Sequence, residues 1–344
     1  MTKSILPPEL QGQFLGVGSI KEDEENEALD YVLDLKLPYA YQKSMKPEED
    51  MIRQFGASLE GFEDKGTFIY DVGYDDFQGV IDEDAGIIPN QKYFSSLHEL
   101  LKKGSFRYLK TQLTAPATMC FSIRGEDGRQ HLTPQMFRFF SRLMARVATG
   151  YVSFLERTVE NLIICQDDPS FGFITEAIEV GNVSGLSARF IMKTTDEIYP
   201  KNVIPAYHYC YDWRVLAENG YHLIWQSKPK IAHLDMIAYP PELEANQAEL
   251  VNSFLQSGGA IALGVIPNVD SAYSEPVLSY FEKALQRSIS LMIKSGISID
   301  LLESNTMVST QCGLSGASPA LSREIHQNSR KYPEIVDKIY MGFR

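Results

Sequence analysis

The sequence repeats one pattern along most of its 344 residues: a short apolar run, a few turn residues, and a longer amphipathic stretch. The apolar runs are rich in β-branched and aromatic residues and do not alternate cleanly between apolar and polar positions. Such runs are typical of parallel strands that are buried on both faces. The runs are residues 14–19, 67–73, 107–116, 161–168, 203–210, 230–237, 260–267 and 305–313.

The stretches between these runs predict helices. Residues 240–258 and 274–296 have Pro or an acidic residue near the start and Gly at the end, which is the usual asymmetry of helix termini. Residues 47–62 and 133–160 are also predicted to be helical. Strands that alternate with helices favour an α/β fold, a single (β/α)8 TIM barrel over residues 1–344. An open doubly wound sheet is the alternative, but the chain has neither a GxGxxG motif nor a P-loop to support it.

Polar residues follow nearly every predicted strand. In a (β/α)8 barrel the residues after the strands gather at the C-terminal face, and that face carries the active site. The sequence therefore predicts an active site built from these residues. They are Gly18–Ser19, Gln112–Thr114, Asp167–Pro169, His208–Cys210, Asp235, Pro267–Asn268 and Gln311–Gly313.

Three of these side chains could share one metal ion. His208 and Cys210 stand two positions apart in one predicted strand, so they face the same side. Cys312 ends the last predicted strand and faces the same mouth of the barrel. Two sulfurs and one imidazole select Zn2+ over Ca2+ or Mg2+, and three protein ligands leave a catalytic site its open position. On spacing alone, a core histidine and ordinary buried cysteines remain the alternative.

Carboxylates after two other strands are further candidates. Asp235 could be an additional ligand, could orient His208 from behind, or could cap the turn after its strand. Asp167 and Asp168 could bind a substrate amine, take part in proton transfer, or cap the next helix. We expect catalytic roles for Asp167 and Asp235, and a structural role for His233.

Composition excludes several classes of protein. The net charge is −13 and no basic cluster is present, so nucleic acid is not an expected partner. The densest charge run, residues 21–27, predicts only a solvated helix start. No apolar run is long enough for a membrane span, and the first residues lack the apolar stretch of a signal peptide. Four cysteines are too few for a disulfide framework, so we expect a soluble, reduced, cytoplasmic protein.

Six motifs are spread over nearly the whole chain: GVGS (16–19), EEDMIRQFGASLEGF (48–62), KTQLTAPATM (110–119), QDDP (166–169), HYCYDW (208–213) and TQCGLSG (310–316). In order and spacing they resemble the catalytic domain of cobalamin-independent methionine synthase. The superfamily of that enzyme also contains uroporphyrinogen decarboxylase and the corrinoid:coenzyme M methyltransferases. The resemblance implies a (β/α)8 barrel whose zinc ion binds the thiol of an acceptor.

The resemblance also implies roles for individual residues at the metal. His208, Cys210 and Cys312 match the family's zinc ligands. Asp235 is the best match for an acidic fourth ligand, although it is one methylene shorter and comes somewhat later in the sequence. A thiol bound to zinc loses its proton at neutral pH and becomes a nucleophile toward a methyl group.

Other positions match the residues that hold the acceptor. Gly18, Ser19 and Asp167 are expected to bind the amino-acid end of homocysteine, the acceptor of the methionine synthases. Glu48 is the candidate for a second acidic residue at the amine. Asp168 stands where the family has Glu.

Short forms of the family resemble enzymes that take the methyl group from methylcobalamin or from a methylated corrinoid protein. This chain has no D-x-H-x-x-G motif, so we expect the corrinoid to be a substrate carried by a partner protein. The predicted function is zinc-dependent methyl transfer from a methyl-corrinoid to homocysteine, giving methionine. The alternatives are a different thiol acceptor such as coenzyme M, a lyase of the uroporphyrinogen decarboxylase type, and a non-catalytic corrinoid- or metal-binding protein.

Overall fold

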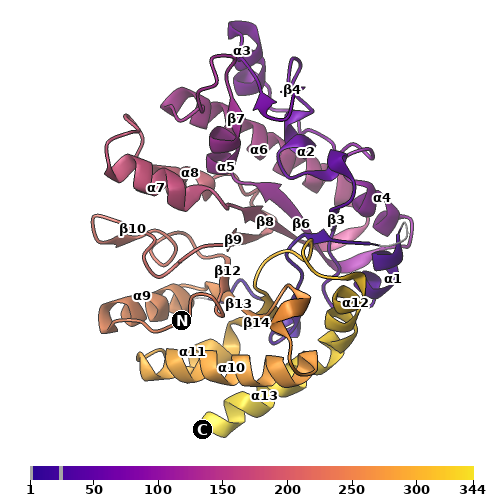
Figure 1. Ribbon diagram of the computed structural model, residues 1–344, viewed down its shortest axis with the longest axis vertical. Helices are drawn as coiled ribbons and strands as arrows, with labels where there is room; N and C mark the ends of the chain where they lie inside the picture. Colours follow the sequence, from indigo (N-terminus) through magenta and orange to yellow (C-terminus); the bar gives the residue numbers. More distant parts are fainter. Residues whose placement is uncertain (1–2, 23–25) are drawn as a thin grey trace.

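The computed structural model describes residues 3–22 and 26–344 and shows an α/β fold. Its centre is a curled sheet of parallel strands in the order β1-β14-β13-β12-β9-β8-β6 (Figure 1). Helices cover the outside of this sheet, so the fold resembles a TIM barrel. Part of the acidic run 21–27 lies outside the described residues, and the first α-helix begins at Glu27.

The strands of the main sheet lie within or close to seven of the predicted runs. They are β1 (Phe14–Leu15), β6 (Phe106–Thr114), β8 (Val159–Asp167), β9 (Ile204–Tyr209), β12 (Ile231–Asp235), β13 (Ala260–Ile266) and β14 (Thr306–Thr310). Short strands form smaller sheets: β2 (Ser19–Ile20), β3 (Gln42–Lys43), β4 (Glu63–Asp64), β5 (Phe68–Ile69), β7 (Ile123–Arg124), β10 (Ala217–Glu218) and β11 (Tyr221–His222).

The helices lie mainly between the strands of the main sheet. They are α1 (Glu27–Leu33), α2 (Arg53–Gly56), α3 (Tyr74–Asp82), α4 (Ser95–Leu101), α5 (Pro116–Ser122), α6 (Pro134–Leu155), α7 (Phe171–Glu179), α8 (Ala188–Thr195), α9 (Ala245–Gln256), α10 (Val277–Lys294), α11 (Ile299–Ser304), α12 (Pro319–Asn328) and α13 (Tyr332–Phe343). Single-turn 3-10 helices are Pro8–Leu10, Pro47–Glu49, Asp270–Ala272 and Ser329–Lys331.

Residues 38–43 connect the two edges of the main sheet. Just after β1, the short strand β2 pairs in parallel with β3. On the other side, Tyr39 forms a parallel bridge with Lys110 of β6, and the N–H of Ala40 donates to the Lys110 carbonyl at 2.9 Å. The segment 38–43 therefore lies between the first strand and β6.

The prediction that 67–73 is a strand of the barrel is wrong. Within that range, β5 belongs to a small separate sheet, where it runs antiparallel to β4 and parallel to β7. The position beside β6 belongs to residues 38–43, which contain few aliphatic side chains and start with a proline. A search for β-branched apolar runs misses such a segment.

Tyrosines hold this missed segment in place. Tyr39 and Tyr41 are buried, and their hydroxyls find partners in His326, at 2.9 Å, and in the Glu22 carboxylate, at 2.9 Å. A buried tyrosine ring contributes a large apolar area, and the hydrogen bond of its hydroxyl avoids the cost of an unpaired polar group. Gly16, at the end of the first strand, leaves room for the Tyr39 ring: a Cβ at Gly16 would lie 2.1 Å from a ring carbon.

The predicted helix 47–62 is much shorter than expected. The Asp50 carboxylate accepts from the N–H groups of Ile52 and Arg53, at 2.9 and 3.1 Å. These side-chain bonds stabilise the turn between the 3-10 helix Pro47–Glu49 and α2, so the two do not join into one helix.

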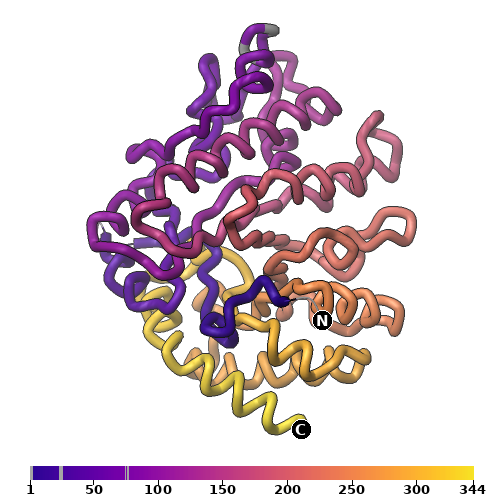
Figure 2. The backbone as a smooth tube through the Cα atoms, turned by 180° about the vertical axis from the view of Figure 1, so that it is seen from behind, coloured from indigo at the N-terminus to yellow at the C-terminus, as the bar shows by residue number. Residues whose placement is uncertain are grey.

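Two apolar cores flank the strands. The larger core lies between the sheet and the helices. The smaller core lines the inside of the curled sheet, and Leu6 and Leu10 of the N-terminal segment pack against it. In Figure 2 this segment crosses the back of the sheet, so it covers the end of the interior opposite the face in Figure 1. The strand residues of the smaller core are Leu15, Tyr108, Ile163, Cys165, Ala206, Ile231, Ala260, Ala262 and Met307.

The longest helix, α6, shows why the amphipathic stretches fold as predicted. Thr133 accepts a hydrogen bond from the Met136 N–H at 3.2 Å, and Pro134 occupies the first turn, where its missing N–H costs nothing. An apolar stripe that includes Phe137, Phe140 and Met144 is buried. None of the helices in the described ranges is both long enough and apolar enough to cross a membrane.

Replacing Gly16 by Ala is expected to destabilise the fold, because the added Cβ meets the Tyr39 ring. Overpacking of this kind costs about 1–3 kcal/mol in the free energy of unfolding. Chemical denaturation of G16A and of the wild type measures this difference. In G79A the new methyl group meets open space, so this control should be as stable as the wild type or slightly more stable. Equal destabilisation in both variants would contradict the packing argument.

Candidate metal centre

His208, Cys210 and Cys312 meet at the end of the curled sheet. His208 lies in β9, Cys210 follows that strand directly, and Cys312 comes two residues after β14. The Cys210 sulfur lies 2.8 Å from His208 Nε2 and 3.6 Å from the Cys312 sulfur, and the Cys312 sulfur lies 3.5 Å from His208 Nε2. Their ligand atoms all lie within 4.8 Å of one another, so the three residues could hold one metal ion.

The donor set suits a borderline-soft ion such as Zn2+. Thiolates and imidazole are the usual ligands of zinc, whereas Ca2+ and Mg2+ prefer oxygen. His208 is buried, but both cysteines are partly exposed, so an ion and a small ligand can reach them.

His233 lies behind His208. The two residues pair across β12 and β9, and their rings are 4.3 Å apart between centroids. The Nδ1 atoms of the two rings are in hydrogen-bond contact, and His233 Nε2 lies 2.8 Å from the Thr310 carbonyl oxygen. His233 is fully buried, and burial together with the charge of His208 holds its pKa well below the usual value.

The two cysteines differ in their electrostatics. A hydrogen bond with Cys210 lowers the pKa of the Cys312 thiol to about 4, and the bond with His208 and the charge of His208 act in the same direction against burial. The same hydrogen bond, together with burial, raises the pKa of Cys210 well above its usual value. Burial opposes a charge on His208, yet the bond with Cys312 keeps the pKa of His208 above the usual value.

Asp235 ends β12 close to this cluster. Its Oδ1 accepts from the N–H groups of Ile237 and Ala238, at 2.8 and 2.9 Å, so it caps the turn after the strand. Gln311 Nε2 donates to both carboxylate oxygens, at 3.2 and 3.1 Å. Burial raises the pKa of Asp235 despite these bonds, and the charge of Cys312 adds to the rise. A catalytic role for Asp235 and its ligation of the metal stay predictions.

Asp167 reaches the same region from β8, where it pairs with His208 of β9. A Cβ at Gly18 would lie 3.8 Å from Asp167 Oδ2, 3.8 Å from Gln112 Nε2 and 3.3 Å from Gln42 Oε1. Gly18 is thus surrounded by one carboxylate and two amides. Burial raises the pKa of Asp167, while the charges of Lys110 and His208 oppose the rise.

The other predicted substrate residues are Ser19 and Glu48. Ser19 packs against the turn that carries Cys312, because a Cβ at Gly313 would lie 2.2 Å from the Ser19 hydroxyl oxygen. Glu48 lies, half-buried, on the 3-10 helix Pro47–Glu49. The neighbouring Glu49 is the buried carboxylate of that helix, and it accepts from the Lys43 N–H at 2.8 Å. Binding of substrate by Glu48 stays a prediction.

Asp168 points away from the group around Gly18. Its carboxylate accepts from the Thr118 hydroxyl at 2.7 Å and from the Tyr207 hydroxyl at 2.9 Å. It is fully buried, and burial raises its pKa to about 6. Asp168 therefore ties β8 to β9 and α5.

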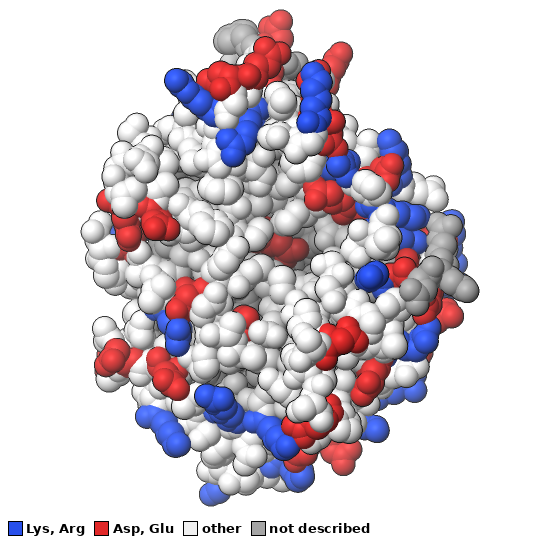
Figure 3. Space-filling view, in the orientation of Figure 1, with Lys and Arg blue, Asp and Glu red and all other residues white. Residues whose placement is uncertain are grey.

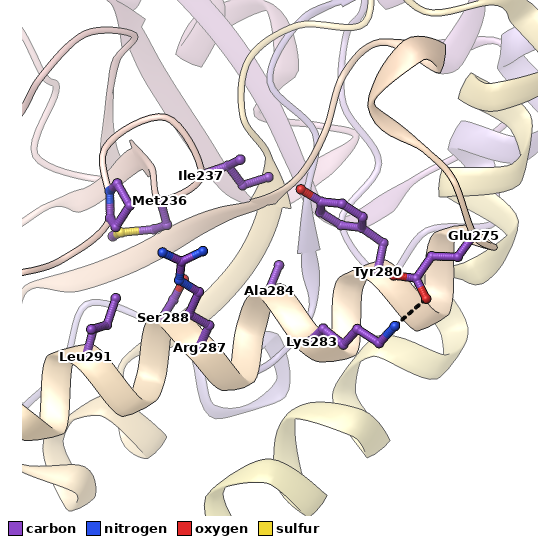
Figure 4. A pocket seen from close by; sticks show the side chains of 10 residues that line it. Met236, Ile237, Glu275, Tyr280, Lys283, Ala284, Arg287, Ser288 and Leu291 are labelled. Carbon is purple, nitrogen blue, oxygen red and sulfur yellow. Dashed lines mark hydrogen bonds and ion pairs between the residues drawn. The ribbon is translucent and has the colours of Figure 1, made fainter.

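The face that carries these residues is hollowed. Figure 3 shows acidic atoms inside a central hollow and a largely uncharged surface around it. A pocket beside the hollow is shown in Figure 4, where Met236 and Ile237 after β12 face Tyr280, Ala284 and Arg287 of α10. Lys283 pairs with Glu275 at its edge, at 2.5 Å. The lining of this pocket does not include the three candidate ligands.

From the sequence, His233 is expected to be structural, Gln112 is one of the polar residues after the predicted strands, and Gln42 is not predicted to belong to the site. His233 lies two positions before Asp235 in the same strand, so the sequence predicts that both side chains face the same side. Its position opposite His208 depends on the register between β12 and β9, which the sequence does not specify.

Comparison with known proteins gives weak likenesses. No protein-family model matches the chain, and no curated protein matches it. A B12-independent methionine synthase from Shewanella sp. W3-18-1, solved in complex with selenomethionine, matches 71% of this chain with a TM-score of 0.48 and 17% identity. This chain spans 66% of that protein, which is less than two thirds of its length. A methyltransferase from Methanosarcina mazei matches 96% of this chain and 93% of its own length, with a TM-score of 0.46 and 8% identity. Both TM-scores lie below 0.5, and neither likeness bears on the chemistry of this chain.

Removal of one candidate ligand is expected to abolish tight metal binding, because two remaining donors no longer enclose an ion. We expect about one zinc per chain in the wild type and little in C210S or C312S after dialysis, measured by elemental analysis. Cys120 is a buried cysteine outside the cluster, so C120A should keep its zinc. Full zinc content in C210S and C312S would contradict the site.

The raised pKa of Asp168 predicts a pH dependence of stability. The folded carboxyl keeps its proton up to about pH 6, whereas in the unfolded chain it ionises near pH 4. Because the folded carboxyl binds its proton more tightly than the unfolded one, the proton stabilises the fold. This stabilisation is complete below about pH 4 and is lost as the pH rises to about 6. Relative to D168N, the free energy of unfolding of the wild type should fall by about 3 kcal/mol between pH 4 and 7. Urea denaturation across this range measures the difference, and a constant difference would contradict the prediction.

Proposed function

We propose that the chain is a zinc-dependent methyltransferase that moves a methyl group from a methyl-corrinoid to the thiol of homocysteine, giving methionine. The observation that carries the proposal is the convergence of His208, Cys210 and Cys312 next to the polar group around Gly18. A soft metal site beside a small polar pocket suits an acceptor that carries a sulfur at one end and an ammonium at the other.

We further infer that the fold is a complete (β/α)8 barrel with its active site at the C-terminal ends of the strands. Support comes from residues 38–43, which lie between the two edges of the main sheet. This segment pairs in parallel with β2 on one side and with β6 on the other. The candidate ligands and Asp167 all lie at or just beyond the C-terminal ends of β8, β9 and β14.

His208, Cys210 and Cys312 would hold the zinc ion. When bound, zinc would act as a Lewis acid that lowers the pKa of the acceptor thiol, which otherwise lies near about 8.5. The partial exposure of both cysteines leaves one side of the cluster open to the acceptor.

Asp167 and its neighbours would bind the ammonium group of the acceptor. Gln112 Oε1 is a buried acceptor without a partner in the described ranges. Nε2 of the same amide and Asp167 Oδ2 would both lie 3.8 Å from a Cβ at Gly18. A buried oxygen without a donor is costly, and an ammonium group supplies donors. The Ser19 hydroxyl, which lies beside Gly313, would bind the carboxylate of the same molecule.

The transfer forms a sulfur–carbon bond with an electron pair of the acceptor thiolate. The methyl group leaves cobalt without the bonding pair, which stays on the corrinoid, and the thiol proton passes to solvent. Alignment of sulfur and methyl carbon is the main contribution that a protein makes to such a displacement. Exposed apolar side chains after β8 and β9, namely Phe173, Tyr211 and Val215, support docking of a large donor carried by a corrinoid protein.

The test is a screen of thiols with the zinc-loaded protein and methylcobalamin, with products identified by mass. We expect methionine from homocysteine. We also expect D167A to lose at least about 30-fold in kcat/KM for homocysteine, because a buried charge partner is removed. A thiol without an amine, such as coenzyme M, should react equally well with D167A and the wild type.

D270A is the control, because Asp270 binds Ser318 outside this group, at 2.6 and 2.7 Å. It should keep full activity. Methyl transfer to coenzyme M but not to homocysteine would replace the proposed acceptor. A protein that binds zinc but methylates no thiol would overturn the proposed function.

A further inference from the structure

His233 occupies a position that packing alone does not require. It is a polar side chain with no solvent exposure, and it lies opposite His208 in the pairing of β12 with β9. Both of its ring nitrogens have partners: Nδ1 contacts His208 Nδ1, and Nε2 lies 2.8 Å from the Thr310 carbonyl oxygen.

These contacts determine where the protons lie. A carbonyl oxygen only accepts hydrogen bonds, so His233 Nε2 must carry a proton and donate it. A neutral imidazole has a single ring proton, so His233 Nδ1 is an acceptor. His208 Nδ1 must then be the donor in the contact between the two rings. In neutral His208 this leaves the lone pair on Nε2, the atom that faces Cys210 and Cys312.

β13, the strand between His233 and Thr310, has an irregularity that allows the hydrogen bond between these two residues. β13 lies between β12 and β14, and its pairing with β14 is irregular between Gly264 and Ile266. Gly264 pairs with Ser309, and a Cβ on Gly264 would lie 3.2 Å from the Thr310 carbonyl oxygen. The irregularity and the missing side chain leave this oxygen accessible to His233.

Thr310 also fixes the third candidate ligand. Its hydroxyl donates to the carbonyl oxygen of Cys312 at 2.8 Å. One residue at the end of β14 thus supports both the histidine pair and the turn that carries Cys312.

We propose that His233 is a positioning residue, which fixes the tautomer and the ring orientation of His208 so that Nε2 presents its lone pair to a metal ion. The inference rests on the proposed metal site but not on the identity of donor or acceptor. Partners behind a histidine ligand raise metal affinity about 10–100-fold in other proteins.

Three variants separate positioning from packing. In H233Q the amide oxygen can accept from His208 and the amide NH2 can donate to Thr310, so the relay is retained. H233L keeps a similar volume but removes both bonds. H326L is the matched control, because His326 is equally buried and bonded, to Tyr39 and to the Ser322 carbonyl, outside the cluster.

The first readout is zinc affinity, measured by competition with a chelator. H233L should bind zinc about 10–100-fold more weakly than the wild type, H233Q should stay within roughly threefold of it, and H326L should lose stability but keep wild-type affinity. Folded H233L with wild-type affinity, or H233Q as weak as H233L, would overturn the proposal.

The second readout uses the metal-free protein and does not depend on its activity. At a pH where His208 is neutral, nitrogen-15 NMR of labelled histidines should show Nδ1 of His208 protonated in the wild type and in H233Q. In H233L the proton should be distributed over both nitrogens. Protonation of His208 Nδ1 that is unchanged in H233L would overturn the relay, even in a protein that methylates thiols. Conversely, a protein inactive toward thiols could still show the relay, so the two proposals fail separately.

Discussion

The site depends on the register of three adjacent parallel strands. The pairing of β8 with β9 sets Asp167 beside His208, and the pairing of β9 with β12 sets His208 beside His233. Side chains alternate along a strand, so a slip of one residue would turn a whole set of them to the opposite side. Small residues inside the sheet, among them Ala206 and Ala262, pack in the apolar core below the histidines. The apolar interior therefore fixes the register, and the register fixes the polar groups above it.

Lys110 marks the change from apolar interior to polar mouth. It is fully buried on β6, and its ammonium group donates to the Val17 carbonyl and lies 5.8 Å from the centre of the Tyr39 ring. Its charge lowers the pKa of Asp167 against the effect of burial, so a buried cation offsets part of the negative charge at the mouth.

The sequence predicts the α/β alternation, seven of the strands and the meeting of His208, Cys210 and Cys312. These features are local: apolar runs, alternation within a strand, and the common direction of parallel strand ends. The segment 38–43 is not predicted, because its core contacts are tyrosine rings whose burial depends on distant partners, His326 among them. The contact between His233 and His208 cannot be predicted from the sequence, because it depends on the register between β12 and β9. The group around Gly18 draws Gln42 and Gln112 from different strands, and no sequence pattern links them.

The position of β14 has a consequence for the order in which the molecule assembles. β14 is the last strand of the chain, and it pairs with both β13 and β1. Cys312 follows it, 102 residues after Cys210. During synthesis, His208 and Cys210 leave the ribosome long before their third partner. Pairing of β14 with β1 and β13 therefore also brings Cys312 to the other two candidate ligands. A nascent chain cannot enclose a metal ion with all three residues until its sheet has formed.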